Sequence, residues 1–171
     1  VHMRWAFLFI AALLAGCAGW PSGGPVCMAG ARLSGSGQCP AQQARGHRIP
    51  FREGTVVRVA QGFHGVNSHN KKELAYSIDF SCEEGTPIVA TRAGVVWAVR
   101  ADSSRGCSDM SCINDANYVI LDHGDGTYSE YQHLRDHGVL VEVGQQVCRG
   151  QAIGLCGNTG YSSGPHLHYA V

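Results

Sequence analysis

The sequence predicts a mostly β fold: a single domain of antiparallel sheets that follows a signal peptide and a flexible linker. Three observations favour this fold class. Glycine is abundant, with 23 residues, and only 15% of the residues are charged. The apolar residues come in short runs bounded by turn-forming residues, as in strands joined by tight turns, and no segment shows a sustained helical pattern. A length of 171 residues fits one hydrophobic core.

The first segment is typical of exported proteins. Met3 and Arg4 precede an apolar run from Trp5 to Ala15, which is about half the roughly 20 residues that a membrane-spanning helix needs. We therefore expect a signal peptide over residues 1–16. The run ends in the sequence LAGC, which resembles the bacterial lipobox and implies a lipid on Cys17. The alternative is a plain secretory signal with an incidental cysteine.

Residues 17–49 are rich in Gly, Ser, Pro and Gln and lack apolar periodicity, so we expect a lipid-anchored linker there. A single folded domain is then expected over residues 50–171. Strand-like runs bounded by turn residues recur in this part. They are Thr55–Val59, Tyr76–Phe80, Ile88–Ala90, Val95–Val99, Tyr118–Leu121 and Val139–Val143. Asp125-Gly126 separates two strand-like runs and predicts a hairpin.

Charge and cysteine content indicate which partners can be excluded and in which compartment the protein is expected. Lys plus Arg and Asp plus Glu both number 13, so no basic surface is expected and nucleic acid is excluded as a partner. Eight cysteines without a CxxC pair suit an oxidising compartment and favour disulfides. Short spacings suggest three local pairs and leave Cys82 over, although connectivity cannot be deduced from spacing. The pairs are Cys27 with Cys39, Cys107 with Cys112, and Cys148 with Cys156.

Histidines and one aspartate are the candidate chemical groups. In His166-Leu167-His168, alternation along a strand places both imidazoles on one face, roughly 6.5 to 7 Å apart. Asp79 lies between Ile78 and Phe80 in a strand-like run, and His133 follows the predicted hairpin. Each of these residues alone has an ordinary structural explanation, such as the polar face of a half-buried strand.

Taken in chain order, these residues resemble the lysostaphin-like, or LytM-type, zinc endopeptidases that cut bacterial peptidoglycan. The resemblance runs from about Gln61 to Val171. It rests on the histidines together with segments that include Asp79-Phe80, Glu84–Ala90, His123–Tyr128, Tyr131–Leu134, Gly157–Gly160 and Ser163–His168. The family implies a LytM-like β-sandwich with a groove, and a zinc ion held by a histidine, an aspartate and the second histidine of H-x-H.

The resemblance implies that Asp79 and His168 are zinc ligands and that His133 and His166 act on the attacking water as catalytic residues. Three protein ligands leave one tetrahedral position open, as in catalytic zinc sites. The usual first ligand would stand four residues before the aspartate, where this chain has Ala75. We expect His69 to substitute for it, and His64, in the same loop, is the competing candidate.

The sequence thus predicts a monomeric zinc metalloendopeptidase of the cell envelope, facing the periplasm or the cell surface. Its expected partners are a peptidoglycan peptide as substrate and a membrane reached through lipid on Cys17. Two rival functions remain: an inactive relative that binds cell wall or activates an amidase, and a peptidase of extracellular proteins. Ala75 fits the inactive relative, whereas Asp79, His133, His166 and His168 favour an enzyme.

Overall fold

The computed structural model describes Cys39 and residues 46–171. The expected signal peptide at residues 1–16, the expected lipid site Cys17, Cys27 and most of the expected linker lie outside the described residues. No helix in the described part is long and apolar enough to cross a membrane.

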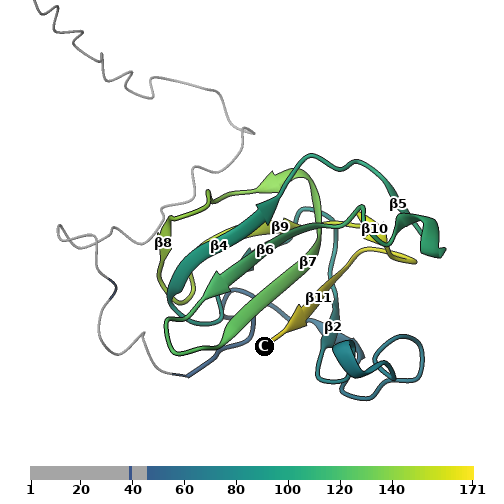
Figure 1. Ribbon diagram of the computed structural model, residues 1–171, viewed down its shortest axis with the longest axis horizontal. Coiled ribbons are helices and arrows are strands. Elements are labelled where there is room, and N and C mark those ends of the chain that lie inside the picture. The colour runs from purple at the N-terminus through teal and green to yellow at the C-terminus, as the bar shows by residue number, and fades with distance from the viewer. Residues whose placement is uncertain (1–38, 40–45) are drawn as a thin grey trace, which may run out of the picture.

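Nearly all of the regular secondary structure in the described residues is antiparallel β-sheet, which confirms the fold class (Figure 1). Its main sheet has nine strands, and seven of them follow the order β1-β2-β11-β7-β6-β4-β8. The remaining two, β3 and β9, pair with each other, and β9 also pairs with β7. The nine strands are β1 (Arg58–Gln61), β2 (Ile78–Ser81), β3 (Pro87–Val89), β4 (Gly94–Arg100), β6 (Asn117–Asp122), β7 (Tyr128–Val139), β8 (Gln146–Val147), β9 (Ala152–Cys156) and β11 (His166–Ala170).

Two short strands, β5 (Gly106–Cys107) and β10 (Gly160–Tyr161), form a separate parallel pair. Helical structure in the described residues is limited to two 3₁₀ turns, η2 (Lys72–Leu74) and η3 (Met110–Cys112).

Side chains of β3 and β9 build the core together with side chains on one face of the other strands of the main sheet. Val119 and Leu121 of β6 and Leu167 of β11 are fully buried together with Ile88 of β3 and Ile153 of β9. Burial alternates along β6, as expected for a strand with one face on the core. The opposite face of β2, β11 and β7 is therefore free to carry polar side chains.

The predicted hairpin joins β6 to β7, whose pairing ends at Asp122 and Tyr128. Gly124 and Gly126 both have positive φ there, at 73° and 86°, and glycine adopts this conformation without steric cost. The hairpin prediction is confirmed.

The strand expected over Val139–Val143 is wrong in most of its length. β7 ends at Val139, and the following residues form a turn in which only Val141 is buried. Leu140 and Val143 are about half to two thirds exposed, so these apolar residues do not belong to a strand that packs on the core. The strand expected at Thr55 begins only at Arg58.

Three disulfides join the described cysteines: Cys39–Cys148, Cys82–Cys156 and Cys107–Cys112. The last was expected. The expected pairs Cys27–Cys39 and Cys148–Cys156 are wrong, and Cys82 is not left over. Cys82 follows β2 and Cys156 ends β9, so the topology brings them together although 74 residues separate them. Such pairs cannot be inferred from spacing.

The N-terminal end of the described chain contacts the domain. The backbone NH of Arg48 donates to Thr91 O at 2.9 Å. The Nδ1 of His47 lies 3.2 Å from Thr91 Oγ1 and 3.1 Å from the hydroxyl of Tyr169. Residues at the end of the expected linker therefore pack against β11 and the loop after β3.

Candidate active site

Asp79 and His168 face each other across two neighbouring strands. β2 and β11 are antiparallel, and their register pairs these two residues directly. The Nδ1 of His168 lies 2.8 Å from Asp79 Oδ1. Both side chains are buried, at 8% and 6% exposure. A carboxylate in such a place needs a compensating partner, because burial penalises its charge.

His69 reaches the same carboxylate from the loop between β1 and β2. It is completely buried, and its Nε2 lies 3.3 Å from Asp79 Oδ1. Its Nδ1 lies 2.9 Å from Gly62 O. A carbonyl oxygen only accepts, so Nδ1 carries the proton and Nε2 keeps a lone pair directed at Asp79. This tautomer is the one that a metal ligand requires.

The other loop histidine is placed differently. His64 is exposed, has a positive φ of 57° and stacks edge-on against Tyr76 at 5.0 Å between ring centroids. Ala75 accepts a hydrogen bond from the His64 NH through its backbone oxygen. The structure therefore brings His69, and not His64, beside Asp79.

His69, Asp79 and His168 form a group whose ligand atoms all lie within 4.8 Å of one another. Neighbouring ligands of a tetrahedral zinc with bonds of about 2.0 to 2.1 Å are roughly 3.3 Å apart. The distances of 3.3 and 2.8 Å from Asp79 Oδ1 are close to this value. The ligand atom that His69 offers, Nε2, is buried and makes no hydrogen bond within the described residues, and His168 offers Nδ1. The donor set and its spacing fit a zinc ion.

The charge state of Asp79 agrees with this arrangement. Burial raises the pKa of this carboxyl, but the hydrogen bond from His168 and the charges of His168, His166 and His69 outweigh burial and hold the pKa below its usual value. The group is therefore a carboxylate at neutral pH, as a metal ligand must be.

Gln61 connects the His69 loop to Asp79, and the sequence did not single it out. Its Nε2 donates to Asp79 Oδ2 at 3.0 Å and to Ser68 Oγ at 2.8 Å. Its Oε1 accepts from the backbone NH of Asn67 and Ser68. A shift in register between Val59 and Gln61 turns this side chain toward Asp79. Such a bulge leaves no clear signal in a sequence.

His133 lies at a bulge of β7. Asn117 pairs with Leu134 and Tyr118 with Gln132, so His133 is the extra residue, with a positive φ of 63°. Its Nδ1 donates to Thr159 O at 2.7 Å. Burial, aided by the nearby charge of His166, lowers the pKa of His133 to about 3. The residue is a neutral imidazole with its Nε2 lone pair available.

His166 stands beside His133, with 4.6 Å between the ring centroids. Its Nδ1 lies 2.8 Å from Gly164 O and 3.2 Å from Ser162 Oγ, and its Nε2 lies 3.9 Å from Asp79 Oδ1. Alternation along β11 places His166 and His168 on the same face, with Leu167 in the core between them. The structure thus brings all five predicted site residues together.

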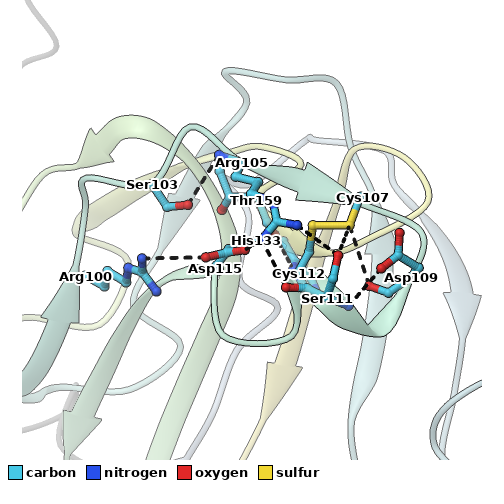
Figure 2. Close-up of a disulfide and its surroundings, with 10 residues drawn as sticks. All are labelled: Arg100, Ser103, Arg105, Cys107, Asp109, Ser111, Cys112, Asp115, His133 and Thr159. Atoms are coloured by element: carbon cyan, nitrogen blue, oxygen red, sulfur yellow. Dashed lines mark hydrogen bonds and ion pairs between the residues drawn. A yellow bond between two sulfur atoms is a disulfide. The ribbon is translucent and has the colours of Figure 1, made fainter.

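These groups border an open cleft of about 590 Å³. Asp79, His133, His166 and His168 line it. One wall is built by β1 and the loop that carries Ser68, and the other by the segments around Ser108 and Ser162. Ser108 belongs to the loop closed by the Cys107–Cys112 disulfide, which Figure 2 shows together with His133 and Thr159. A peptide in this cleft can reach the four site residues that line it, whereas His69 is completely buried and does not line the cleft.

Comparison with known proteins places the chain in a family. Residues 73–171 match the profile of Peptidase family M23. This range includes Asp79, His133, His166 and His168 but begins four residues after His69.

Two curated proteins and one crystal structure illustrate the similarity. The chain is 43% identical over 93 residues to the peptidoglycan DD-endopeptidase ShyA of Vibrio cholerae, across 54% of this chain and 19% of that protein. It is 37% identical over 97 residues to lysostaphin of Staphylococcus simulans, across 56% of this chain and 17% of lysostaphin. The crystal structure of a zinc-containing peptidase from Vibrio cholerae superimposes with a TM-score of 0.55 at 30% identity, across 73% of this chain and 36% of that one.

The chain thus spans about a fifth of the length of these curated relatives. The family profile covers more than half of the chain, and it contains the H-x-H pair and the aspartate that face each other across β2 and β11. The predicted resemblance is confirmed: the chain belongs to Peptidase family M23.

Proposed function

We propose that this protein is a zinc-dependent endopeptidase that hydrolyses peptide bonds in bacterial peptidoglycan. The observation that carries the proposal is the group His69, Asp79 and His168, whose spacing suits one tetrahedral metal at the floor of an open cleft. The relatives named as a peptidoglycan DD-endopeptidase and as lysostaphin support the substrate class.

In this proposal His69, Asp79 and His168 hold the zinc, which supplies Lewis acidity to the scissile carbonyl and to a water molecule. His133 accepts the proton of the attacking water on Nε2, because its Nδ1 is occupied by Thr159 O. His166 is anchored at Nδ1 by Gly164 O and directs Nε2 toward the same region. Either imidazole, once protonated, donates to the oxyanion of the tetrahedral intermediate.

The proposal extends to the place of the protein in the cell. A signal peptide over residues 1–16, a lipid on Cys17 and a linker to residue 49 would hold a monomeric peptidase domain of residues 50–171 at the periplasmic or outer surface. The pattern of the first 17 residues and the three disulfides support this arrangement.

Zinc content and release of peptide fragments from purified peptidoglycan test the function. The wild-type protein should bind one zinc ion and release fragments. His69→Ala should lose both, because it removes a buried ligand, and His64→Ala should keep both, because that imidazole faces solvent and Tyr76. A wild-type protein that binds no zinc and releases nothing, yet sediments with cell walls, would favour the wall-binding relative.

A further inference from the structure

We propose that the loop closed by Cys107–Cys112, residues 105–115, positions the imidazoles of His133 and His166, so that this disulfide is required for turnover and not for metal binding. The inference rests on the proposed function and concerns a part of the cleft wall to which the family resemblance assigns no role. We call residues 105–115 the disulfide loop.

The disulfide loop holds the segment from Thr159 to Ser162. β5 and β10 pair in parallel, with Gly106 opposite Gly160 and Cys107 opposite Tyr161, and this pair is separate from the main sheet. The NH of Gly160 donates to Arg105 O at 2.8 Å, and the NH of Ser162 donates to Cys107 O at 2.9 Å. A Cβ at Gly106 would lie 1.8 Å from Asn158 O, so the two backbones touch.

The same segment contacts both catalytic candidates. Thr159 O accepts from His133 Nδ1 at 2.7 Å, and Ser162 Oγ lies 3.2 Å from His166 Nδ1. The three metal-binding candidates are held elsewhere: His69 by Gly62 O, and Asp79 by Gln61 and His168. A displacement of the disulfide loop would therefore reach the two imidazoles at the water and leave the metal ligands in place.

Side-chain contacts give the disulfide loop a defined shape, as Figure 2 shows. Arg105 donates to Ser111 O, to Ser111 Oγ and to Asp115 Oδ2, at 3.0, 2.8 and 2.7 Å. Asp109 Oδ1 accepts from the Ser111 NH at 2.8 Å and caps the 3₁₀ turn η3. Arg105, Asp109 and Ser111 are exposed, so water competes for their hydrogen bonds. The Cys107–Cys112 disulfide is covalent and is not weakened by this competition.

The test is the double variant Cys107→Ser/Cys112→Ser in the full chain, assayed on a soluble crosslinked peptidoglycan peptide. We expect kcat to fall roughly 10-fold to 100-fold, since small misplacements of catalytic groups have effects of this size. KM and zinc content should stay at the wild-type values. Gly106→Ala, which separates β5 from Asn158 without removing a cysteine, should lower kcat in the same way.

The matched control is Cys39→Ser/Cys148→Ser, which removes a disulfide far from the cleft. The Cys39–Cys148 disulfide joins residues 109 positions apart, whereas Cys107–Cys112 joins residues 5 positions apart. Loss of Cys39–Cys148 should therefore lower the midpoint of thermal unfolding more than loss of Cys107–Cys112 does. The control variant should leave kcat unchanged at a temperature where the protein is folded. Unchanged kcat in both Cys107→Ser/Cys112→Ser and Gly106→Ala, or a loss of zinc equal to the loss of kcat, would overturn the proposal.

Histidine NMR separates this inference from the proposed function. In ¹⁵N-labelled wild-type protein, His133 and His166 should show the Nδ1–H tautomer, because their Nδ1 atoms face Thr159 O and Gly164 O. In Cys107→Ser/Cys112→Ser the His133 signal should shift toward a mixture of tautomers, and the His69 signal should not change. An unchanged His133 signal would contradict the positioning role even if the wild-type protein hydrolysed nothing.

Discussion

Gln61 joins the two parts of the candidate metal centre, the loop that carries His69 and the strand that carries Asp79. It donates to Asp79 Oδ2 and to Ser68 Oγ, next to His69. Groups that orient metal ligands in this way typically contribute 10-fold to 100-fold in metal affinity. Gln61→Leu should therefore weaken zinc binding by about this factor in competition with a chromogenic chelator.

Gln145→Leu is the control for that substitution. The Gln145 side chain also accepts a backbone NH, that of Glu142, but it lies in the turn before β8. Equal zinc affinities for Gln61→Leu and wild type would show that Gln61 does not orient the carboxylate.

Arg58 is the one Lys or Arg side chain that lines the cleft within the described residues, and it has no ion-pair partner among them. It pairs with Ser81 across β1 and β2, two residues from Asp79, which is about 7 Å along the strand. A peptide with a free carboxylate about two residues from the scissile bond can therefore reach the guanidinium. Arg58→Gln should raise KM roughly 5-fold to 10-fold for such a peptide and little for its amidated form.

Arg52→Gln makes the same change of charge at an exposed arginine that does not line the cleft. It should leave the KM of both peptides unchanged. A rise in KM that is equal for the free and the amidated peptide would contradict carboxylate recognition by Arg58.

At the scale of the secondary-structure elements, β11 joins the core to the site. Leu167 is fully buried in the core, and its neighbours His166 and His168 face the cleft. Leu167→Ala should lower the free energy of unfolding by about 2 to 5 kcal/mol. Urea unfolding of the zinc-free protein measures this loss. Val56→Ala, at a side chain that is 96% exposed, should change it by less than about 0.5 kcal/mol.

Short apolar runs bounded by turn residues could be predicted as strands from the sequence. The strands expected at Ile78, Val95 and Tyr118 lie close to β2, β4 and β6, and burial alternates along β6. The twelve-residue β7 was not recognised as one long strand, because its open face is polar and the bulge at His133 breaks the alternation. The valines after Val139 are typical of a strand in sequence, but β7 ends at Val139 and a turn follows.

The candidate site likewise contains residues that could be predicted from the sequence and residues that could not. Alternation correctly placed His166 and His168 on one face, and the family resemblance identified Asp79 and His133. The choice of His69 over His64 depends on how a loop folds back on β2, and the structure resolves it through the contact of Nδ1 with Gly62 O. Gln61 and the Cys82–Cys156 pair are products of strand register, so local sequence could not reveal them.

At the scale of the whole molecule, acid should destabilise the fold through His133. Its pKa is about 6.5 in the unfolded chain and about 3 in the folded protein, because the folded state buries it. The unfolded chain therefore binds more protons between these values, and the free energy of unfolding falls as the pH drops below about 6.5, by up to about 1.4 kcal/mol per pH unit.

Urea unfolding of the zinc-free protein at pH 7.5, 6.0 and 5.0 measures this slope. Zinc is removed by a chelator before the measurement, so that release of metal at low pH does not contribute to the slope. His133→Gln should show a flatter dependence, and His137→Gln, at an exposed histidine, should keep the wild-type slope. Parallel curves for wild type and His133→Gln would contradict the assignment.

The Cys39–Cys148 disulfide determines where the preceding chain leaves the domain. Cys148 directly follows β8, which lies four strands from β11 in the sheet order, or about 19 Å away at the usual strand spacing (Figure 1). If Cys17 is held at a bilayer, the roughly 20 residues before Cys39 give a working radius of at most about 75 Å. In such a protein the β8 edge would face the bilayer and the candidate active site would face away from it. The length of the segment between Cys17 and Cys39 would then limit how far into the cell wall the active site can reach.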